Sequence, residues 1–120
     1  MSKNVLGATA AFSGGFAVIL GALAAHALND QLSEAGNLGS WKTAVLYHLT
    51  HSILALFLAQ SGFRKIAWTM LAGILLFSGS IYCLCLLDGM SWLGPVTPLG
   101  GLLMIIGWLA LGVAYLKKTE

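Results

Sequence analysis

The sequence predicts an all-α fold: an integral membrane bundle of four transmembrane helices with both termini in the cytoplasm. The prediction depends on composition, on the spacing of charged residues and on the distribution of the basic ones. Hydrophobic residues make up 58% of the 120 residues, charged residues only 8%, and the mean hydropathy is +0.88. Soluble domains carry about 25% charged residues, so this chain lacks the side chains that a water-facing surface needs. The net charge of +2 is small, and the absence of a basic run argues against nucleic-acid binding.

Charged residues divide the chain into four long apolar runs. The first lies between Lys3 and Asp30, and the others cover residues 43–63, 66–87 and 89–116. Each run has about the 20 residues that a helix needs to cross a hydrocarbon core ~30 Å thick. We therefore expect a single membrane domain over residues 1–120, with approximate spans at 5–28, 42–62, 66–87 and 93–116.

The first span has a superficial likeness to a signal peptide, but it is much longer than the ~7–15 residues of a signal core. We expect a membrane helix instead. Lipid is as apolar as leucine, so helices in a bilayer associate largely through close backbone approach. One stripe of small residues on the first span suits such contact, and Gly15 and Ala22 widen it; the stripe comprises Gly7, Ala11, Gly14, Val18, Gly21 and Ala25. Whether it packs within the bundle or between copies stays open.

The later spans have their own packing and boundary signals. Ser40 is a candidate N-cap of the second span. Pro95 and Pro98 fall in the first turns of the fourth span, where a missing N–H is least harmful. The segment 29–40 is the only sizeable extramembrane piece, and it is too short to form a domain. Glycines of the third and fourth spans are expected to mark further helix contacts, namely Gly79, Gly100, Gly101 and Gly107.

The basic residues predict the orientation. With four crossings, both termini and the 62–65 turn share one side of the membrane, and this side carries Lys3, Arg64, Lys65, Lys117 and Lys118. The opposite side carries Lys42 beside Asp30, Glu34 and Asp88. Short loops rich in Lys and Arg stay in the cytoplasm, so we expect a multi-pass protein of the bacterial inner membrane with both termini inside. Aromatic residues are expected at the outer boundary (Trp41, Trp92) and at the inner one (Trp68, Tyr115).

Polar residues should gather at one depth in the outer half of the bundle. At a rise of ~1.5 Å per residue, His48 lies about 10 Å and His51 about 14 Å below the boundary at Trp41. Ionisable groups inside a membrane nearly always face the bundle interior. The expected polar cluster consists of His26, Thr43, Tyr47, His48, His51, Ser78, Ser80 and Tyr82.

Three interpretations of this cluster compete, and the favoured one is interhelical hydrogen bonding. In it, neutral His48 and His51 donate to carbonyls or to the hydroxyls of Ser78 or Ser80, each bond contributing about 0.6 kcal/mol. The second interpretation is a metal or haem site built from His26 with His48 or His51. The third is a proton relay or a solute path through histidine and tyrosine.

Other features weaken the functional alternatives. No carboxylate falls inside the spans, so a histidine base has no acidic partner to orient it. Cys83 and Cys85 are two residues apart on a helix and point to nearly opposite sides, which disfavours a shared ion or an ordinary disulfide. Trp108 is expected to serve packing. We expect neither an enzyme nor a bound cofactor.

Several sequence blocks, in order along the chain, resemble one family. They are GALAAHAL (21–28), WKTAVLYHLTH (41–51), LFSGSIYCL (76–84), TPLGG (97–101) and GW (107–108). They are similar to the motifs of the domain of unknown function 423 family, small bacterial inner-membrane proteins with four predicted helices. The resemblance implies four helices and an inner-membrane location, but it brings no settled activity and no catalytic residues. His48 falls outside the family pattern.

Together these observations predict a small polytopic inner-membrane protein in the lipid bilayer. We expect a non-enzymatic component or scaffold that self-associates or assembles with other membrane proteins. The alternative is an outer-half pocket that binds a metal, haem or a small ligand, or relays protons; its residues would be His26, Tyr47, His51 and Tyr82.

Overall fold

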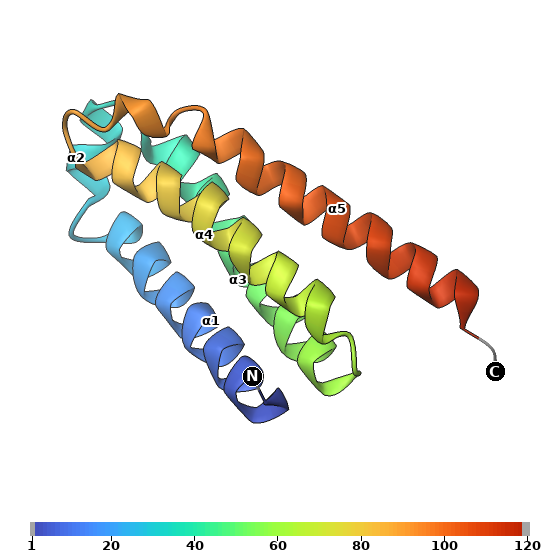
Figure 1. Ribbon diagram of the computed structural model, residues 1–120. Coiled ribbons are helices and arrows are strands. Elements are labelled where there is room, and N and C mark those ends of the chain that lie inside the picture. Colours follow the sequence, from blue (N-terminus) through green and yellow to red (C-terminus); the bar gives the residue numbers. More distant parts are fainter. Residues whose placement is uncertain (1, 119–120) are drawn as a thin grey trace.

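The computed structural model describes residues 2–118, and this part of the chain folds into helices without any strand (Figure 1). The four long helices are α1 (Lys3–Ala25), α3 (Leu38–Gln60), α4 (Arg64–Leu86) and α5 (Val96–Lys117). A short helix, α2 (Asn29–Glu34), joins α1 to α3, and a single 3-10 turn, η1 (Ser91–Leu93), precedes α5. All four long helices are apolar and long enough to cross a membrane. The prediction of an all-α membrane bundle is confirmed.

The helix ends differ from the predicted spans by a few residues. α1 stops at Ala25 because the chain turns there, and the backbone N–H of Leu28 closes the helix on the carbonyl of Leu23 at 2.8 Å. α3 begins at Leu38, so Ser40 lies inside its first turn and is not the N-cap. The turn before α3 contains Gly36 with φ 72°, a conformation that costs glycine little.

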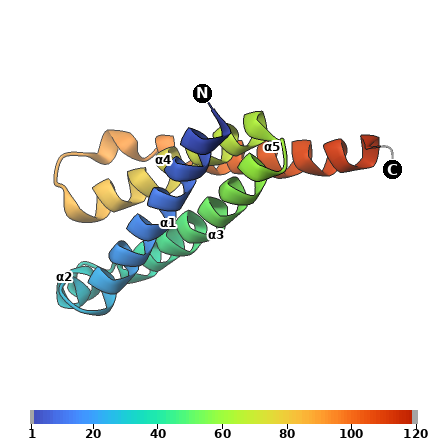
Figure 2. The ribbon, with the colours of Figure 1, turned by 90° about the horizontal axis from the view of Figure 1, so that it is seen from below.

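The four long helices form a row. α1 packs on α3, α3 on α4, and α4 on α5, whereas α1 touches α4 only slightly. In Figure 1, α1 and α5 lie at opposite edges of the row. Figure 2 shows the α1–α3 pair inclined to the α4–α5 pair. The bundle is therefore open, and each edge helix has one principal neighbour.

Small residues allow the closest helix contacts. On α1, a Cβ added at Gly7, Gly14 or Gly21 would lie 3.2–3.7 Å from the nearest side chain of α3. On α5, a Cβ at Gly100 would overlap the backbone of α4 at Phe77, so this crossing requires glycine. Gly101 lies beside the Phe77 ring, and Gly107 lies against Met70. A Cβ on Gly79 would meet only Leu75 of its own helix, at 3.8 Å, so Gly79 makes no such interhelical contact.

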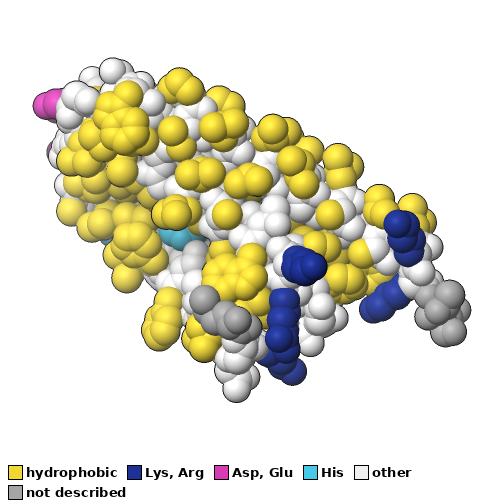
Figure 3. Space-filling view, in the orientation of Figure 1, with side chains coloured by type: hydrophobic (Ala, Val, Ile, Leu, Met, Phe, Trp, Pro, Cys, Tyr) yellow, Lys and Arg dark blue, Asp and Glu magenta, His cyan; other side chains and the backbone are white. Residues whose placement is uncertain are grey.

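Charges separate along the length of the molecule. Lys and Arg side chains gather at the end that holds the termini and the α3–α4 turn, whereas acidic side chains lie at the α2 end (Figure 3). Trp92 is 64% exposed at the α2 end, as a boundary residue would be. Trp41 lies at the same end but is fully buried against Leu20, Ala24 and Leu32. α2 covers it, so Trp41 is a core residue and not a boundary one.

Candidate functional site

His48 is the centre of a buried network that joins three helices. Its Nδ1 lies 2.9 Å from the Tyr82 hydroxyl of α4, and its Nε2 lies 3.1 Å from the Ser13 hydroxyl of α1. Ser13 in turn lies 2.7 Å from the Ser52 hydroxyl, and Ser52 donates to the His48 carbonyl at 2.7 Å. His48 is only 4% exposed. We call Ser13, His48, Ser52 and Tyr82 the His48 network.

The backbone carbonyl of His48, which accepts from Ser52, sets the direction of every hydrogen bond in this network. Ser52 gives its one hydrogen to that carbonyl, so it accepts from Ser13, and Ser13 then accepts from His48 Nε2–H. A neutral imidazole has one donor and one acceptor nitrogen, so Nδ1 accepts from the Tyr82 hydroxyl. Neutral histidine is the form that suits membrane depth, because a charge there is costly.

His51 forms a separate link, from α3 to α5. The indole N–H of Trp108 donates to His51 Nε2 at 3.0 Å, and Nδ1 lies 2.8 Å from the Tyr47 carbonyl. An indole N–H can only donate and a carbonyl can only accept, so His51 carries its proton on Nδ1. The Tyr47 ring stacks on the imidazole with centroids 5.7 Å apart. We call Tyr47, His51 and Trp108 the His51 clasp.

Further polar side chains bind neighbouring helices. Ser78 of α4 is fully buried and donates to the Ala44 carbonyl of α3 at 2.7 Å. Trp41 of α3 donates to the Leu20 carbonyl of α1 at 2.9 Å. Ser80 bonds to the hydroxyl of Thr97 at the start of α5. Within residues 2–118, every buried side-chain nitrogen and oxygen has a hydrogen-bond partner.

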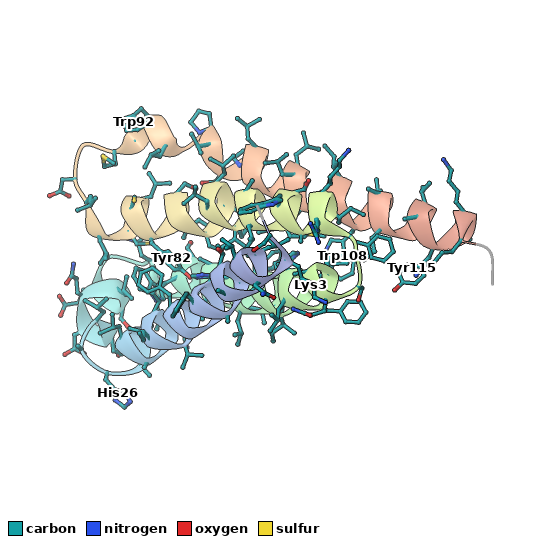
Figure 4. All side chains as sticks on the ribbon, turned by 60° about the horizontal axis from the view of Figure 1, so that its bottom comes forward. Lys3, His26, Tyr82, Trp92, Trp108 and Tyr115 are labelled. Carbon is teal, nitrogen blue, oxygen red and sulfur yellow. The ribbon has the colours of Figure 1, made fainter. Side chains whose placement is uncertain are left out.

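An apolar groove runs between α1 and α4 and exposes part of the His48 network. Its volume is about 710 Å³. Its walls include Phe12 and Phe16 of α1 and Trp68 and Leu75 of α4, and Gly79 also lines it. The polar groups in its lining include Ser13, His48 and Tyr82. Figure 4 shows Tyr82 in the space between α4 and α1. We call this feature the α1–α4 groove.

The structure divides the predicted polar cluster. His26 is exposed after the last turn of α1, and Figure 4 shows it pointing away from Tyr82. Thr43 is also exposed. The remaining residues of the cluster fall into the His48 network, the His51 clasp and the serine bonds described above. Among the described residues, no three His, Cys, Asp or Glu side chains come together as a metal site requires.

Sequence reasoning missed three members of these networks. Ser13 and Ser52 were not singled out, although Ser13 is a polar residue beside the small stripe of α1 and could have been found there. Trp108 was assigned to packing, yet it donates to His51. The expected partners of the histidines are carbonyls, Ser78 or Ser80. His51 does donate to a carbonyl, that of Tyr47 on its own helix, whereas His48 pairs with Tyr82 and Ser13.

Comparison with known proteins identifies relatives without an assigned activity. A family model described as protein of unknown function (DUF423) matches residues 20–101. The UPF0382 membrane protein YwdK of Bacillus subtilis is 42% identical, over 84% of this chain and 87% of the relative. A UPF0382 membrane protein of Haemophilus influenzae is 39% identical over 98% of both chains, and one of Schizosaccharomyces pombe is 41% identical over 82% and 91%. No solved structure matches the chain.

Proposed function

Because the chain belongs to the DUF423 family of membrane proteins of unknown function, we propose that it is a non-catalytic component of the bacterial inner membrane that associates with a second copy of itself. The family match confirms the resemblance found in the sequence, and the four apolar helices fit a polytopic membrane protein. The self-association, the inner-membrane location and the absence of catalysis are the proposed parts.

The observation that carries self-association is a second stripe of small residues on α1 that has no neighbour. Gly7, Gly14 and Gly21 face α3. The adjacent stripe lies at the free edge of the row and is exposed along its whole length; it comprises Ala8, Ala11, Gly15, Val18, Ala22 and Ala25. A Cβ on Gly15 would meet nothing within 4 Å. Small residues at three- and four-residue spacing let helix backbones approach closely in a bilayer. We call this surface the α1 edge stripe.

The non-catalytic role is supported by how the polar residues are used. Both ring nitrogens of His48 and of His51 are engaged in bonds within the chain, and these bonds tie α3 to α1, α4 and α5. Among residues 2–118, no carboxylate pairs with either imidazole to raise its basicity, which activated catalytic histidines commonly need. The polar groups therefore serve to hold the row of helices together.

Matched glycine variants test self-association. Gly15→Leu places a bulky side chain on the α1 edge stripe, and Gly112→Leu does the same on exposed α5, where a Cβ also meets nothing within 4 Å. In nanodiscs, energy transfer between two labelled copies should fall for Gly15→Leu, with apparent dimer affinity lowered on the order of tenfold. The Gly112→Leu control should match the unmodified chain. Equal transfer for all three, or monomers throughout, would reject this interface.

Labelling of single cysteines tests the orientation. The charge separation supports cytoplasmic termini, because basic loops stay inside. With Cys83 and Cys85 replaced by serine, Glu34→Cys reports the α2 end and Ser61→Cys reports the α3–α4 turn; both positions are exposed. In intact spheroplasts, an impermeant maleimide should label Glu34→Cys and spare Ser61→Cys. The reverse pattern would place the basic end outside and contradict the orientation.

A further inference from the structure

We propose that the α1–α4 groove binds a neutral single-chain lipid that carries a hydroxyl group. The alkyl chain would lie along the apolar walls between α1 and α4, and the hydroxyl would donate a hydrogen bond to Tyr82 or Ser13. This site is independent of the α1 edge stripe, because Phe12, Ser13 and Phe16 lie on a different face of α1.

The dimensions of the groove suit one chain. Its volume of about 710 Å³ falls within the ~300–1,000 Å³ of typical ligand pockets, which are mostly apolar with few polar groups. On α4 the lining runs from Trp68 to Tyr82, about 21 Å at ~1.5 Å per residue. A helix is ~10 Å wide, so filling that length would take on the order of 1,600 Å³. A helix of a second copy could therefore enter the groove only in part, whereas one alkyl chain fits along it.

The His48 network determines the polarity of the preferred ligand. The Tyr82 hydroxyl donates its hydrogen to His48, and the Ser13 hydroxyl donates its hydrogen to Ser52. Both residues line the groove and keep a free lone pair. The His48 network consequently presents hydrogen-bond acceptors to the groove, and its hydroxyl hydrogens are already engaged in bonds within the network. Beside Tyr82 and Ser13 an alcohol can use these acceptors, whereas an ether or a ketone would find a donor there only if Tyr82 released His48. Trp68, whose indole N–H is a donor, lines the opposite end of the groove.

Depth in the bilayer favours a neutral polar group. Ser13 lies near the middle of α1 (Lys3–Ala25), and His48 lies near the middle of α3 (Leu38–Gln60). A phosphate or an ionised carboxylate is costly at this depth, and the groove lining contains no Lys or Arg to pair with it. Phospholipid and ionised fatty acid are therefore disfavoured as specific occupants, although their chains compete for the apolar walls.

A matched pair of photoactivatable lipids tests the proposal. The full chain in phosphatidylcholine nanodiscs is titrated with 1-hexadecanol carrying a diazirine in its chain, and separately with the methyl ether of the same compound. Labelled positions are mapped by mass spectrometry. We expect label on α1 and α4, with half-saturation at a concentration about fivefold lower for the alcohol, as one net hydrogen bond provides.

Two glycine variants separate groove binding from general lipid contact. Gly79→Leu places a bulky side chain in the groove lining, and its Cβ would meet only Leu75 of its own helix, at 3.8 Å. It should reduce alcohol labelling at least tenfold with an unchanged melting temperature, while Gly112→Leu labels like the unmodified chain. Equal half-saturation concentrations for the alcohol and the ether would overturn the proposal, because the groove would then accept any alkyl chain without selecting a hydroxyl group. Labelling that persists in Gly79→Leu, or label confined to α5, would overturn it as well.

Discussion

His48 and His51 lie one turn apart on the same helix, and both are buried, at 4% and 7% exposure. Each uses both ring nitrogens. They differ in their partners. His48 bonds to two hydroxyls, which can donate or accept. The closest partners of His51 are an indole N–H and a carbonyl, which cannot exchange roles, and the Thr50 hydroxyl lies farther from Nδ1, at 3.2 Å. The hydrogen-bonding freedom of a buried histidine therefore depends on its neighbours as much as on its burial.

The surroundings of the two imidazoles extend this difference. His48 lines the α1–α4 groove, which is open toward lipid. His51 is enclosed by the stacked Tyr47 ring and by Trp108, whose ring approaches edge-on with centroids 5.9 Å apart. A ligand in the groove can therefore contact the His48 network, whereas the His51 ring is covered by Tyr47 and Trp108 and lines no such groove.

The largest expected difference is in stability. His48→Phe removes two hydrogen bonds to other helices, whereas His51→Phe removes one. At about 0.6 kcal/mol per interhelical bond, with some added cost for partners left unpaired, we expect the free energy of unfolding to fall by about 1–2 kcal/mol for His48→Phe and by about 0.6–1 kcal/mol for His51→Phe. Denaturation in mixed micelles measures both.

Thr69→Val is the control for that comparison, because its hydroxyl bonds only to the Lys65 carbonyl of its own helix, at 2.9 Å. Its free energy of unfolding should stay within about 0.5 kcal/mol of the unmodified chain. A loss for His51→Phe as large as that for His48→Phe would remove the proposed distinction between a three-helix network and a two-helix clasp.

A smaller effect is expected for the coupling within the His51 clasp. Trp108→Phe deletes the indole donor and keeps an aromatic ring in its place. In a double-mutant cycle with His51→Phe, the coupling energy should be about 0.6 kcal/mol and at most about 1.7 kcal/mol. Additive losses would mean that the Trp108–His51 bond does not hold α5 to α3.

The finest test concerns proton positions and involves no change in stability. His48 should carry its proton on Nε2 and His51 on Nδ1, because their partners impose opposite tautomers. Nitrogen-15 chemical shifts of the two imidazoles in lipid distinguish the tautomers. Addition of hexadecanol should shift the His48 signals and leave those of His51 in place. Identical tautomers at both positions would contradict the assigned bond directions.

Much of the fold follows from sequence for clear physical reasons. Four helices are predictable because the charged residues interrupt apolar runs of spanning length, and a backbone in lipid must satisfy its own hydrogen bonds. The start of α5 is predictable from Pro95, which is its N-cap, and from Pro98 in its first turn. The order of the helices in the open row was not predictable. A glycine stripe indicates that another helix can approach closely, but it does not indicate which helix.

The polar networks could be predicted less fully than the fold, because sequence does not show which helix a side chain faces. Periodicity placed His48 and His51 on the inner side of α3, but it could not show that the two imidazoles face different helices. Their partners Ser13 and Trp108 are 35 and 57 residues away along the chain. Depth alone also grouped His26 with the other two, although the end of α1 at Ala25 leaves His26 in an exposed turn.

The row order also has a consequence for membrane insertion. Each sequential hairpin contains its own tight seam: glycines of α1 fit α3, and Gly100 of α5 fits α4. The junction between the hairpins combines apolar packing, such as Leu58 against Met70 and its neighbours, with polar bonds from Ser78 to the Ala44 carbonyl and from Tyr82 to His48. During biogenesis, each hairpin can thus complete its own apolar contact on entering the bilayer. The buried hydroxyls and the imidazole then pair when the two halves meet.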